Sequence, residues 1–333
     1  MAQDRRHHYV PAFYLAQFVE SRGEDGELWV FDGEQVRSWK NTPRGSGHER
    51  DFNRIEVPDV DPLAVEKEIF GAVENIAAPV IKGWCSRANG SLTLGMTAFT
   101  TTIEELSAIL TFIAAQSIRV PRMRESIDQF HTDITRRILD LTSETEDVFT
   151  EAQAHNETLR ELTREDLRAF VDDPSFRAKV ANAGYFGSLL PVMTPITDLL
   201  ALRKWAVICA ASGAPDFITS DDPVLLLPPK DAHPFFGTGF GTPGSIVCVP
   251  LSSRHMLWGV DLEARAKPVL NVAVVQGTER SVAALNRAIL VRADRFLYAG
   301  SADFSWLRDD GHVGDFEDLR KTRERSARGR RPR

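Results

Sequence analysis

A change in the apolar pattern near Lys204 constrains the fold of this chain more than any other feature. Residues 61–203 repeat apolar side chains at the three- and four-residue spacing of amphipathic helices. From Lys204 onward, short apolar runs are bounded by glycine, proline, serine and aspartate, which is typical of strands. These runs are 205–210, 217–219, 224–227, 246–250 and 255–260. Helices followed by strands predict an α+β fold, with a mixed or antiparallel sheet and a large central helical region.

Local signals predict individual elements. Proline suits the first position of a helix, and we expect a short helix from about Pro11 to Glu20. The segments 27–32 and 35–39 are expected to form a hairpin. The run Thr101-Thr102-Ile103-Glu104-Glu105 makes a capping-box pattern that predicts the start of a helix. Further helices are expected over 61–84, 164–182, 186–202 and 278–291, and a strand over 295–299. We also expect strands from the two ends of the chain to join one sheet.

Length and composition indicate an ordinary globular protein. The 333 residues, 43% hydrophobic and 26% charged, suit two domains or one large domain with an insertion. We divide the chain into an N-terminal segment with a hairpin (1–60), a helical region (61–203), an α+β region (204–305) and a basic, disordered tail (306–333). No apolar run approaches the roughly 18 residues that a membrane span needs, and no signal peptide is evident. No membrane association and a cytoplasmic location are therefore expected.

Charge and cysteine content narrow the classes of partner. The net charge is −7, but the last fourteen residues, 320–333, carry eight basic residues and one acid, or +7. Subtracting this leaves −14 for residues 1–319, which repels polyanions, so only the tail is expected to attract nucleic acid or an acidic partner. The alternative is a solubilising end without a partner. Cys85, Cys209 and Cys248 are odd in number and far apart, which argues against a disulfide framework or a Cys-x-x-Cys metal site.

Cationic and imidazole side chains precede the proline of the first predicted helix. Arg5, Arg6, His7 and His8 lie within six positions of Pro11. A helix N-terminus attracts anions, so these residues predict a small pocket for a phosphate or carboxylate group. Adjacent side chains of an extended segment point to opposite faces, so the two histidines are not expected to bind one metal ion together. The alternative is a histidine that hydrogen-bonds a backbone carbonyl and positions the helix.

A second polar group ends an apolar run at Thr219-Ser220-Asp221-Asp222, just before Pro223. Polar loops after strands are common functional sites. Either carboxylate can orient a histidine, bind a divalent cation or act as a base. The alternative is an Asx-turn that only ends the strand.

Charged and amide side chains also occupy apolar helix positions. Gln116 and Arg119 continue the apolar register of 109, 113 and 120, while Glu66 and Glu74 lie in or beside the register of Phe70. Burying an unpaired charge is costly, so Arg119 must reach solvent or pair with a carboxylate. The candidates are Glu66, Glu74, Asp221 and Asp222. The result is either a structural ion-pair network or a catalytic site.

Several of these segments together resemble a known family. They are His8-Tyr9-Val10-Pro11, Tyr14-Leu15 with Phe18, Glu49–Asn53, Gln116 with Arg119-Val120-Pro121, Ile218–Val224, and Asn286. The chain resembles the bacterial family called domain of unknown function 4238 across most of its length. The position of Asp222 is often asparagine in that family, so the resemblance favours Asp221 as the essential carboxylate. It implies no reaction, cofactor or substrate.

These observations lead to three functional hypotheses. The first is a hydrolase, nuclease-like or phosphodiesterase-like, acting on a phosphate-containing substrate. Its catalytic candidates are His8, Gln116, Arg119 and Asp221, with His8 as base or anion ligand and Arg119 stabilising negative charge. Its ligand-binding candidates are Arg6, His7, Tyr9, Ser220 and Asn286. A divalent metal is an open alternative, with Asp221, Glu66 and Glu74 as its candidate ligands. The second hypothesis is a non-catalytic anion- or nucleotide-binding sensor, and the third is an interaction protein that works through its basic tail.

Overall fold

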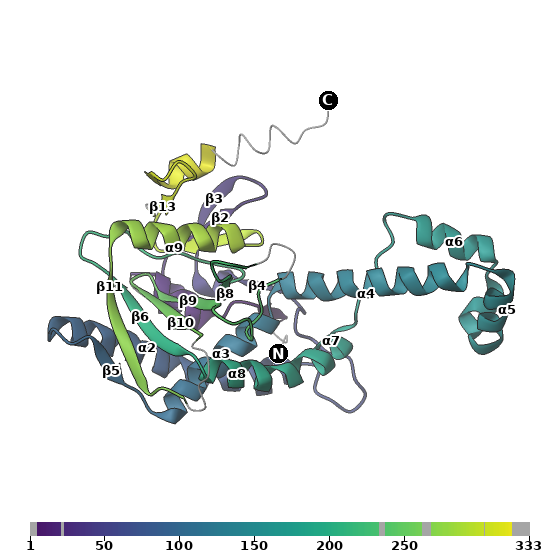
Figure 1. Cartoon of the computed structure of the whole chain (residues 1–333), viewed down its shortest axis with the longest axis horizontal. Helices are drawn as coiled ribbons and strands as arrows, with labels where there is room; N and C mark the ends of the chain where they lie inside the picture. Colours follow the sequence, from purple (N-terminus) through teal and green to yellow (C-terminus); the bar gives the residue numbers. More distant parts are fainter. Residues whose placement is uncertain (1–4, 21–22, 233–236, 262–267, 303, 322–333) are drawn as a thin grey trace.

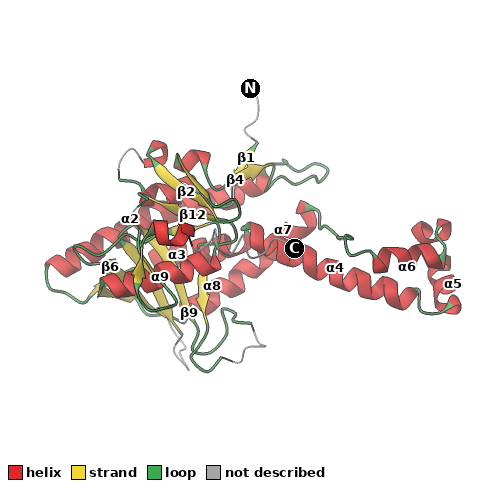
Figure 2. Ribbon diagram, turned by 90° about the horizontal axis from the view of Figure 1, so that it is seen from above, coloured by secondary structure: helices red, strands yellow, loops and turns green. Residues whose placement is uncertain are grey.

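The computed structural model describes residues 5–20, 23–232, 237–261, 268–302 and 304–321. It has an α+β fold, in which a body with two main sheets carries a helical arm that projects to one side (Figures 1 and 2). The predicted fold class is confirmed, because one sheet is mixed and the other is antiparallel. Within the described residues, no helix is both long and apolar enough to cross a membrane.

The larger sheet has six strands. Their spatial order is β5 (Ala98–Thr100), β11 (Asn271–Gly277), β6 (Lys204–Ala210), β10 (His255–Val260), β9 (Ile246–Ser252) and β8 (Leu225–Leu227). Neighbours are antiparallel except β11 and β6, which run parallel, so the sheet is mixed. β11 is absent from the sequence prediction, and its neighbours in the sheet come from distant parts of the chain.

The smaller sheet joins the two ends of the chain, as expected. Its order is β3 (Arg37–Asn41), β2 (Leu28–Asp32), β12 (Phe296–Ala299) and β7 (Thr219–Ser220), all antiparallel. The predicted hairpin is therefore confirmed as β2–β3. Two short ladders complete the strands: β1 (Arg6–His8) with β4 (His48–Arg50), and β13 (Trp306–Leu307) with β14 (Val313–Gly314).

Alternating side chains of the larger sheet supply two apolar cores. Val247, Val249 and Leu257 face the core beneath α2 (Gly71–Thr93), α3 (Ile103–Ile118) and α8 (Met193–Ala201). Cys248 and Met256 face the opposite core, beneath α9 (Glu279–Arg292). Thr102 and Glu105 form the predicted capping box at the start of α3. The helix predicted from residue 61 instead has a π-helical turn at Val65–Phe70, and α2 continues past the predicted end at 84.

Other predicted elements also differ from the structure. The helix expected over 11–20 is only α1 (Ala12–Leu15), followed by a 3-10 turn at Ala16–Phe18. The helix expected over 186–202 is α7 (Asn182–Leu189), a 3-10 turn at Leu190–Val192, and α8. The strand expected over 217–219 is displaced to β7, because pairing with β12 selects Thr219 and Ser220.

The arm consists of three helices. α4 (Pro121–Thr142) starts with proline at its first position, and α5 (Glu146–His155) and α6 (Arg164–Asp172) lie near its far end (Figure 1). The prediction that α6 extends to residue 182 is wrong. Residues after α6 run back along α4, where the hydroxyl of Thr132 accepts the amide of Ala178 at 3.0 Å. These contacts with α4 replace the helical hydrogen bonds of the segment.

Candidate functional site

His7 lies at the centre of β1 and its side chain is only 1% exposed. Its Nδ1 accepts the backbone amide of Asn53 at 2.9 Å. A neutral imidazole that accepts through Nδ1 carries its proton on Nε2. This Nε2 is buried and has no hydrogen-bond partner among the described residues. His7 therefore presents a buried N–H donor that the protein itself leaves unused.

Glu66 lies beside His7 on the π-helical turn before α2. Its Oε2 accepts the amide Nδ2 of Asn53 at 2.6 Å, and its Oε1 lies 3.4 Å from the backbone nitrogen of His8. Burial raises the pKa of Glu66, whereas the Asn53 hydrogen bond and the electrostatic interactions with His7 and Arg119 oppose the rise. Single π-helical turns occur often at functional sites. Here the turn brings a carboxylate under the N-terminal strand.

Arg119 ends α3 inside the protein, where it is 1% exposed. Its Nε donates to Oε1 of Gln116 at 2.9 Å, its Nη1 pairs with Oε1 of Glu74 at 2.6 Å, and its guanidinium lies 5.0 Å from the centre of the Phe70 ring. The partner carboxylate is thus Glu74. Nη2 is buried without a partner among the described residues. Gln116 also donates through Nε2 to the carbonyl of Tyr9 at 2.7 Å, so it connects α3 to the N-terminal segment.

His8 follows on the other side of β1 and is partly buried. Burial lowers the pKa of His8 to about 4, and the nearby ring of His48, 5.4 Å away, adds to the decrease. A hydrogen bond to the carbonyl of Arg44 opposes it. The ring is therefore neutral near pH 7, and one of its nitrogens keeps a lone pair.

These residues form one group, which His8 joins through its backbone nitrogen while its ring lies on the other side of β1. We call it the histidine–arginine cluster. Its members are His7, His8, Asn53, Glu66, Glu74, Gln116 and Arg119. Four of its buried polar atoms lack a hydrogen-bond partner in the described part of the chain: His7 Nε2, His8 Nε2, Asn53 Oδ1 and Arg119 Nη2. Native proteins pair nearly all such atoms, so a concentration of unpaired ones marks a place for water or a ligand.

Asp221 occupies a different part of the fold. Its two oxygens accept the backbone amides of Asp294, Arg295 and Phe296 at 2.7–2.8 Å, which holds the start of β12 against β7. Burial raises the pKa of Asp221 to about 6, and these three hydrogen bonds oppose the rise. Its link to the cluster is indirect, since the hydroxyls of Tyr298 and Tyr9 hydrogen-bond each other beside Asp221.

The other candidates near Asp221 also bind protein groups. Ser220 Oγ accepts the amide of Asp222 at 3.2 Å, and Asp222 Oδ2 pairs with Nε of Arg292 at 2.6 Å and of Arg122 at 3.2 Å. The side chain of Asn286 binds three backbone groups, at residues 216, 218 and 305. These contacts join β7, α4 and α9, and are those of residues that hold the fold together.

The N-terminal arginines and the candidate metal ligands lie in separate parts of the structure. Arg5 Nε donates to Oδ1 of Asp51 at 2.8 Å at the surface, and Arg6 is on β1 opposite Arg50. Among the described residues, no three histidine, cysteine, aspartate or glutamate side chains are grouped as metal ligands. The candidates Glu66, Glu74 and Asp221 therefore do not meet in such a group. The described part of the segment expected to be a disordered tail, residues 306–321, contains β13 and β14, whereas residues 322–333 lie outside the described residues.

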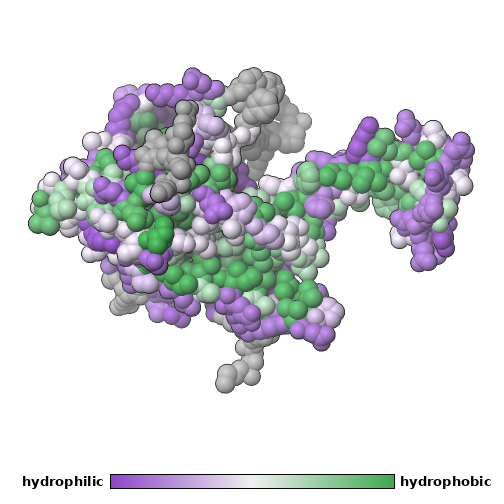
Figure 3. Space-filling model, turned by 60° about the horizontal axis from the view of Figure 1, so that its bottom comes forward, coloured by the Kyte–Doolittle hydropathy of each residue, from purple (hydrophilic) through white to green (hydrophobic). Residues whose placement is uncertain are grey.

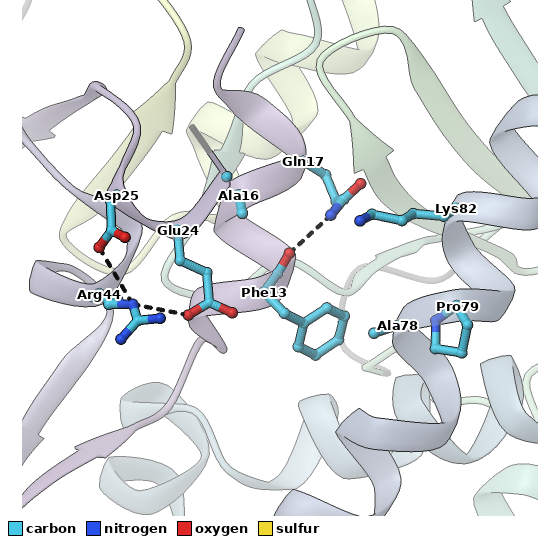
Figure 4. A pocket seen from close by; sticks show the side chains of 10 residues that line it. Phe13, Ala16, Gln17, Glu24, Asp25, Arg44, Ala78, Pro79 and Lys82 are labelled. Atoms are coloured by element: carbon cyan, nitrogen blue, oxygen red, sulfur yellow. Dashed lines mark hydrogen bonds and ion pairs between the residues drawn. The ribbon is translucent and has the colours of Figure 1, made fainter. Parts of the chain in front are cut away.

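A hollow of about 670 Å³ is lined by Arg44, whose carbonyl faces the His8 ring, and by no member of the cluster itself. Figure 4 shows Phe13 and Gln17 from the N-terminal segment and Lys82 from α2 around it, with Arg44 paired to Glu24 on the opposite side. Arg44 connects the hollow to the surroundings of His8, because its side chain lines the hollow while its carbonyl faces the His8 ring.

A family model described as protein of unknown function (DUF4238) matches residues 6–303. The chain belongs to this family. No curated protein and no solved structure matches it. The DUF4238 region covers the whole histidine–arginine cluster and both main sheets, but not the tail after residue 303.

Sequence reasoning on this DUF4238 chain missed several residues that complete the polar groups. Asn53 was noticed only as part of the Glu49–Asn53 segment, yet it binds both His7 and Glu66. Arg122 and Arg292 went unnoticed as partners of Asp222. The sequence indicated only that a buried aspartate needs a cationic partner. It did not indicate which of the 40 lysines and arginines is that partner.

Proposed function

We propose that this protein is a hydrolase of a phosphate-containing substrate and that the histidine–arginine cluster is its active site. One observation supports this most directly. The N–H of His7 Nε2 and Nη2 of Arg119 are buried donors without partners among the described residues, and both side chains act electrostatically on Glu66. Arginine and imidazole N–H groups are the donors that bind phosphoryl oxygens and stabilise their charge.

Two titratable groups provide proton transfer in this proposal. His8, neutral because burial lowers its pKa to about 4, accepts a proton from the attacking water. Glu66, whose pKa burial raises, retains a proton to higher pH than an ordinary glutamate. It donates that proton to the leaving oxygen as the phosphorus–oxygen ester bond breaks.

The remaining members position these groups. Gln116 binds Nε of Arg119 and leaves Nη2 free, while Asn53 fixes the ring of His7 and the carboxylate of Glu66. In this proposal the rest of the substrate occupies the hollow lined by Arg44, the residue whose carbonyl faces the His8 ring. The proposal differs from the initial hypothesis in the carboxylate, because Asp221 is already bound by three backbone amides.

Deep burial supports a second candidate function. His7 and Arg119 are each 1% exposed, and Arg119 is already paired with Glu74. A non-catalytic anion- or nucleotide-binding module uses the same donors without turnover, and it needs no open path for water and product.

The test uses two generic substrates, p-nitrophenyl phosphate and bis(p-nitrophenyl) phosphate. We expect wild-type turnover that falls about 100-fold or more in His8→Asn and Glu66→Gln. The matched control, His131→Asn, changes an exposed histidine on α4 and should keep full activity. Thermal unfolding verifies that each variant is folded at the assay temperature.

The outcomes separate the two functions. Equal rates in wild type, His8→Asn and Glu66→Gln would contradict the hydrolase proposal. No turnover, combined with a phosphate-dependent rise in the wild-type unfolding temperature that Glu66→Gln changes, would support the binding module instead.

A further inference from the structure

One face of the arm helix α4 is apolar and open to solvent. Phe130, Ile134, Ile138 and Leu141 are 57, 42, 56 and 46% exposed. Figure 3 shows apolar side chains gathered along the arm. The opposite face of α4 is covered by the returning segment, through Thr132 and residues near it. An exposed apolar stripe of this kind marks an interaction surface.

The spacing of the stripe is symmetric. Ile127 is half-buried because it also packs against the core that includes Phe70 and Tyr185. With it, the apolar positions are 127, 130, 134, 138 and 141, and they lie at equal distances on either side of Ile134. A two-fold axis through Ile134, perpendicular to the helix, therefore places Phe130 opposite Ile138 of a second copy. It places Ile127 opposite Leu141 in the same way. Self-complementarity of this kind is what a two-fold interface requires.

We propose that α4 pairs antiparallel with α4 of a second copy of this chain, centred on Ile134. The paired segment extends from residue 127 to residue 141 and is about 21 Å long, at a helical rise of about 1.5 Å per residue. This inference does not depend on the proposed hydrolase activity, since the stripe belongs to the arm and the histidine–arginine cluster to the body.

The charges beside the stripe agree with the antiparallel direction. Asp133 and Arg137 are four positions apart, so they lie on the same side of the stripe. The two-fold axis brings that side of one helix to the same side of the other. Arg137, now paired with Asp140 at the surface, then comes within one helical turn of Asp133 of the second copy, and the reverse contact forms by symmetry.

The placement of the body and a hollow at the base of the arm also favour this direction. The body lies at one end of α4 and the α5–α6 tip at the other (Figure 2), so a parallel pair crowds both bodies together whereas an antiparallel pair separates them. A hollow of about 550 Å³ at the base is lined by α4 residues, among them Arg122, Gln129 and Phe130, and by Asp294. The proposed pairing places residues 139–146 of the second copy over this hollow.

The test is the mass of the full-length protein in solution, by sedimentation or light scattering, over a range of micromolar concentrations. We expect wild type to reach twice the mass of one chain. Ile134→Asp should have the mass of one chain, because the axis brings two carboxylates together. Ile134 is exposed in the single chain, so the variant should keep the wild-type unfolding temperature measured at a concentration where both are single chains.

Two further variants test the geometry. Asp133→Arg and Arg137→Asp should each weaken the dimer, and the double exchange should restore it. Mild oxidation should cross-link Ile134→Cys rapidly and the control Glu165→Cys, on α6, slowly. A wild-type chain that stays single, or an Ile134→Asp variant that still dimerises, would overturn the proposal and leave the stripe to a different partner.

Discussion

The amide Nε2 of Gln116 donates to the carbonyl of Tyr9 at 2.7 Å across 107 positions of sequence. The same side chain accepts Nε of Arg119 through Oε1. One buried amide thus joins α3, the N-terminal segment and the only guanidinium of the cluster. Because both ends of the amide are used, the orientation of Arg119 depends on Gln116.

Replacing Gln116 with leucine should therefore destabilise the protein. The change leaves the Tyr9 carbonyl and the Arg119 Nε buried without partners, which should lower the free energy of unfolding by about 2–4 kcal/mol. Urea unfolding measures the loss. Gln35→Leu, at an exposed position in the turn between β2 and β3, is the control and should change stability by less than about 0.5 kcal/mol. A similar loss of unfolding free energy in both variants would contradict the stabilising role assigned to the hydrogen bonds of Gln116.

Asp221→Asn should affect stability more than chemistry. The asparagine side chain offers one oxygen where the carboxylate accepts three amides, so we expect a loss of about 2–3 kcal/mol in unfolding free energy. At temperatures where the variant is folded, any hydrolase activity should persist. Asp59→Asn, at an exposed loop position with a φ of 62° that asparagine tolerates, is the matched control. A fully folded Asp221→Asn protein without hydrolase activity would instead indicate that Asp221 takes part in catalysis.

His255 should make the protein less stable in acid. Its Nδ1 binds Ser252 Oγ and its Nε2 binds Asn89 Oδ1, and burial lowers its pKa to about 4. Between pH 6.5 and 4 the unfolded chain takes up a proton at this residue and the folded chain does not. The contribution of neutral His255 is thus complete above pH 6.5 and is lost as the pH falls.

The comparison with His255→Gln isolates this effect. Stability should fall between pH 7 and pH 5 more steeply in wild type than in the variant, because His8 and Asp221 contribute equally to both. Denaturant unfolding at the two pH values gives the slopes. His131→Gln, an exposed histidine on α4, should keep the wild-type slope, and a His255→Gln slope as steep as wild type would refute the assignment.

Gly47→Ala should be strongly destabilising. Gly47 has a φ of 65°, and its carbonyl accepts the amides of both Tyr9 and Val10. A Cβ atom there meets the carbonyl oxygen of Val10 at 2.8 Å, so the N-terminal segment has to move. We expect a loss of about 2 kcal/mol or more in thermal or urea unfolding.

Gly90→Ala provides the opposite expectation at a matched residue. Gly90 lies inside α2 with open space around its Cβ position, so alanine should add up to about 1 kcal/mol through helix propensity. If both alanine variants change stability in the same direction, the backbone conformation at Gly47 is not the cause of the stability change in Gly47→Ala.

The elements predicted well are those whose signals are local. The capping box at the start of α3 and the β2–β3 hairpin each depend on a few neighbouring residues. The helix predicted to run to residue 182 fails for the opposite reason. There, contacts with α4 outweigh the helical preference of the segment.

Part of the candidate site was also evident without a structure. A glutamine, an arginine and two glutamates stood at apolar helix positions, and a buried charge must find a partner. The sequence alone therefore identified Gln116, Arg119, Glu66 and Glu74 as residues with buried polar contacts.

Which groups meet was decided only by the tertiary structure. The sequence did not reveal that Arg119 pairs with Glu74, that Asn53 binds His7, or that three backbone amides of β12 bind Asp221. Each contact joins segments that are 45 or more positions apart, so it exists only once the strands have paired and the helices have packed. The sequence by itself determined which side chains needed partners, through local spacing and the cost of buried charge. The packing of distant segments determined which residues became those partners.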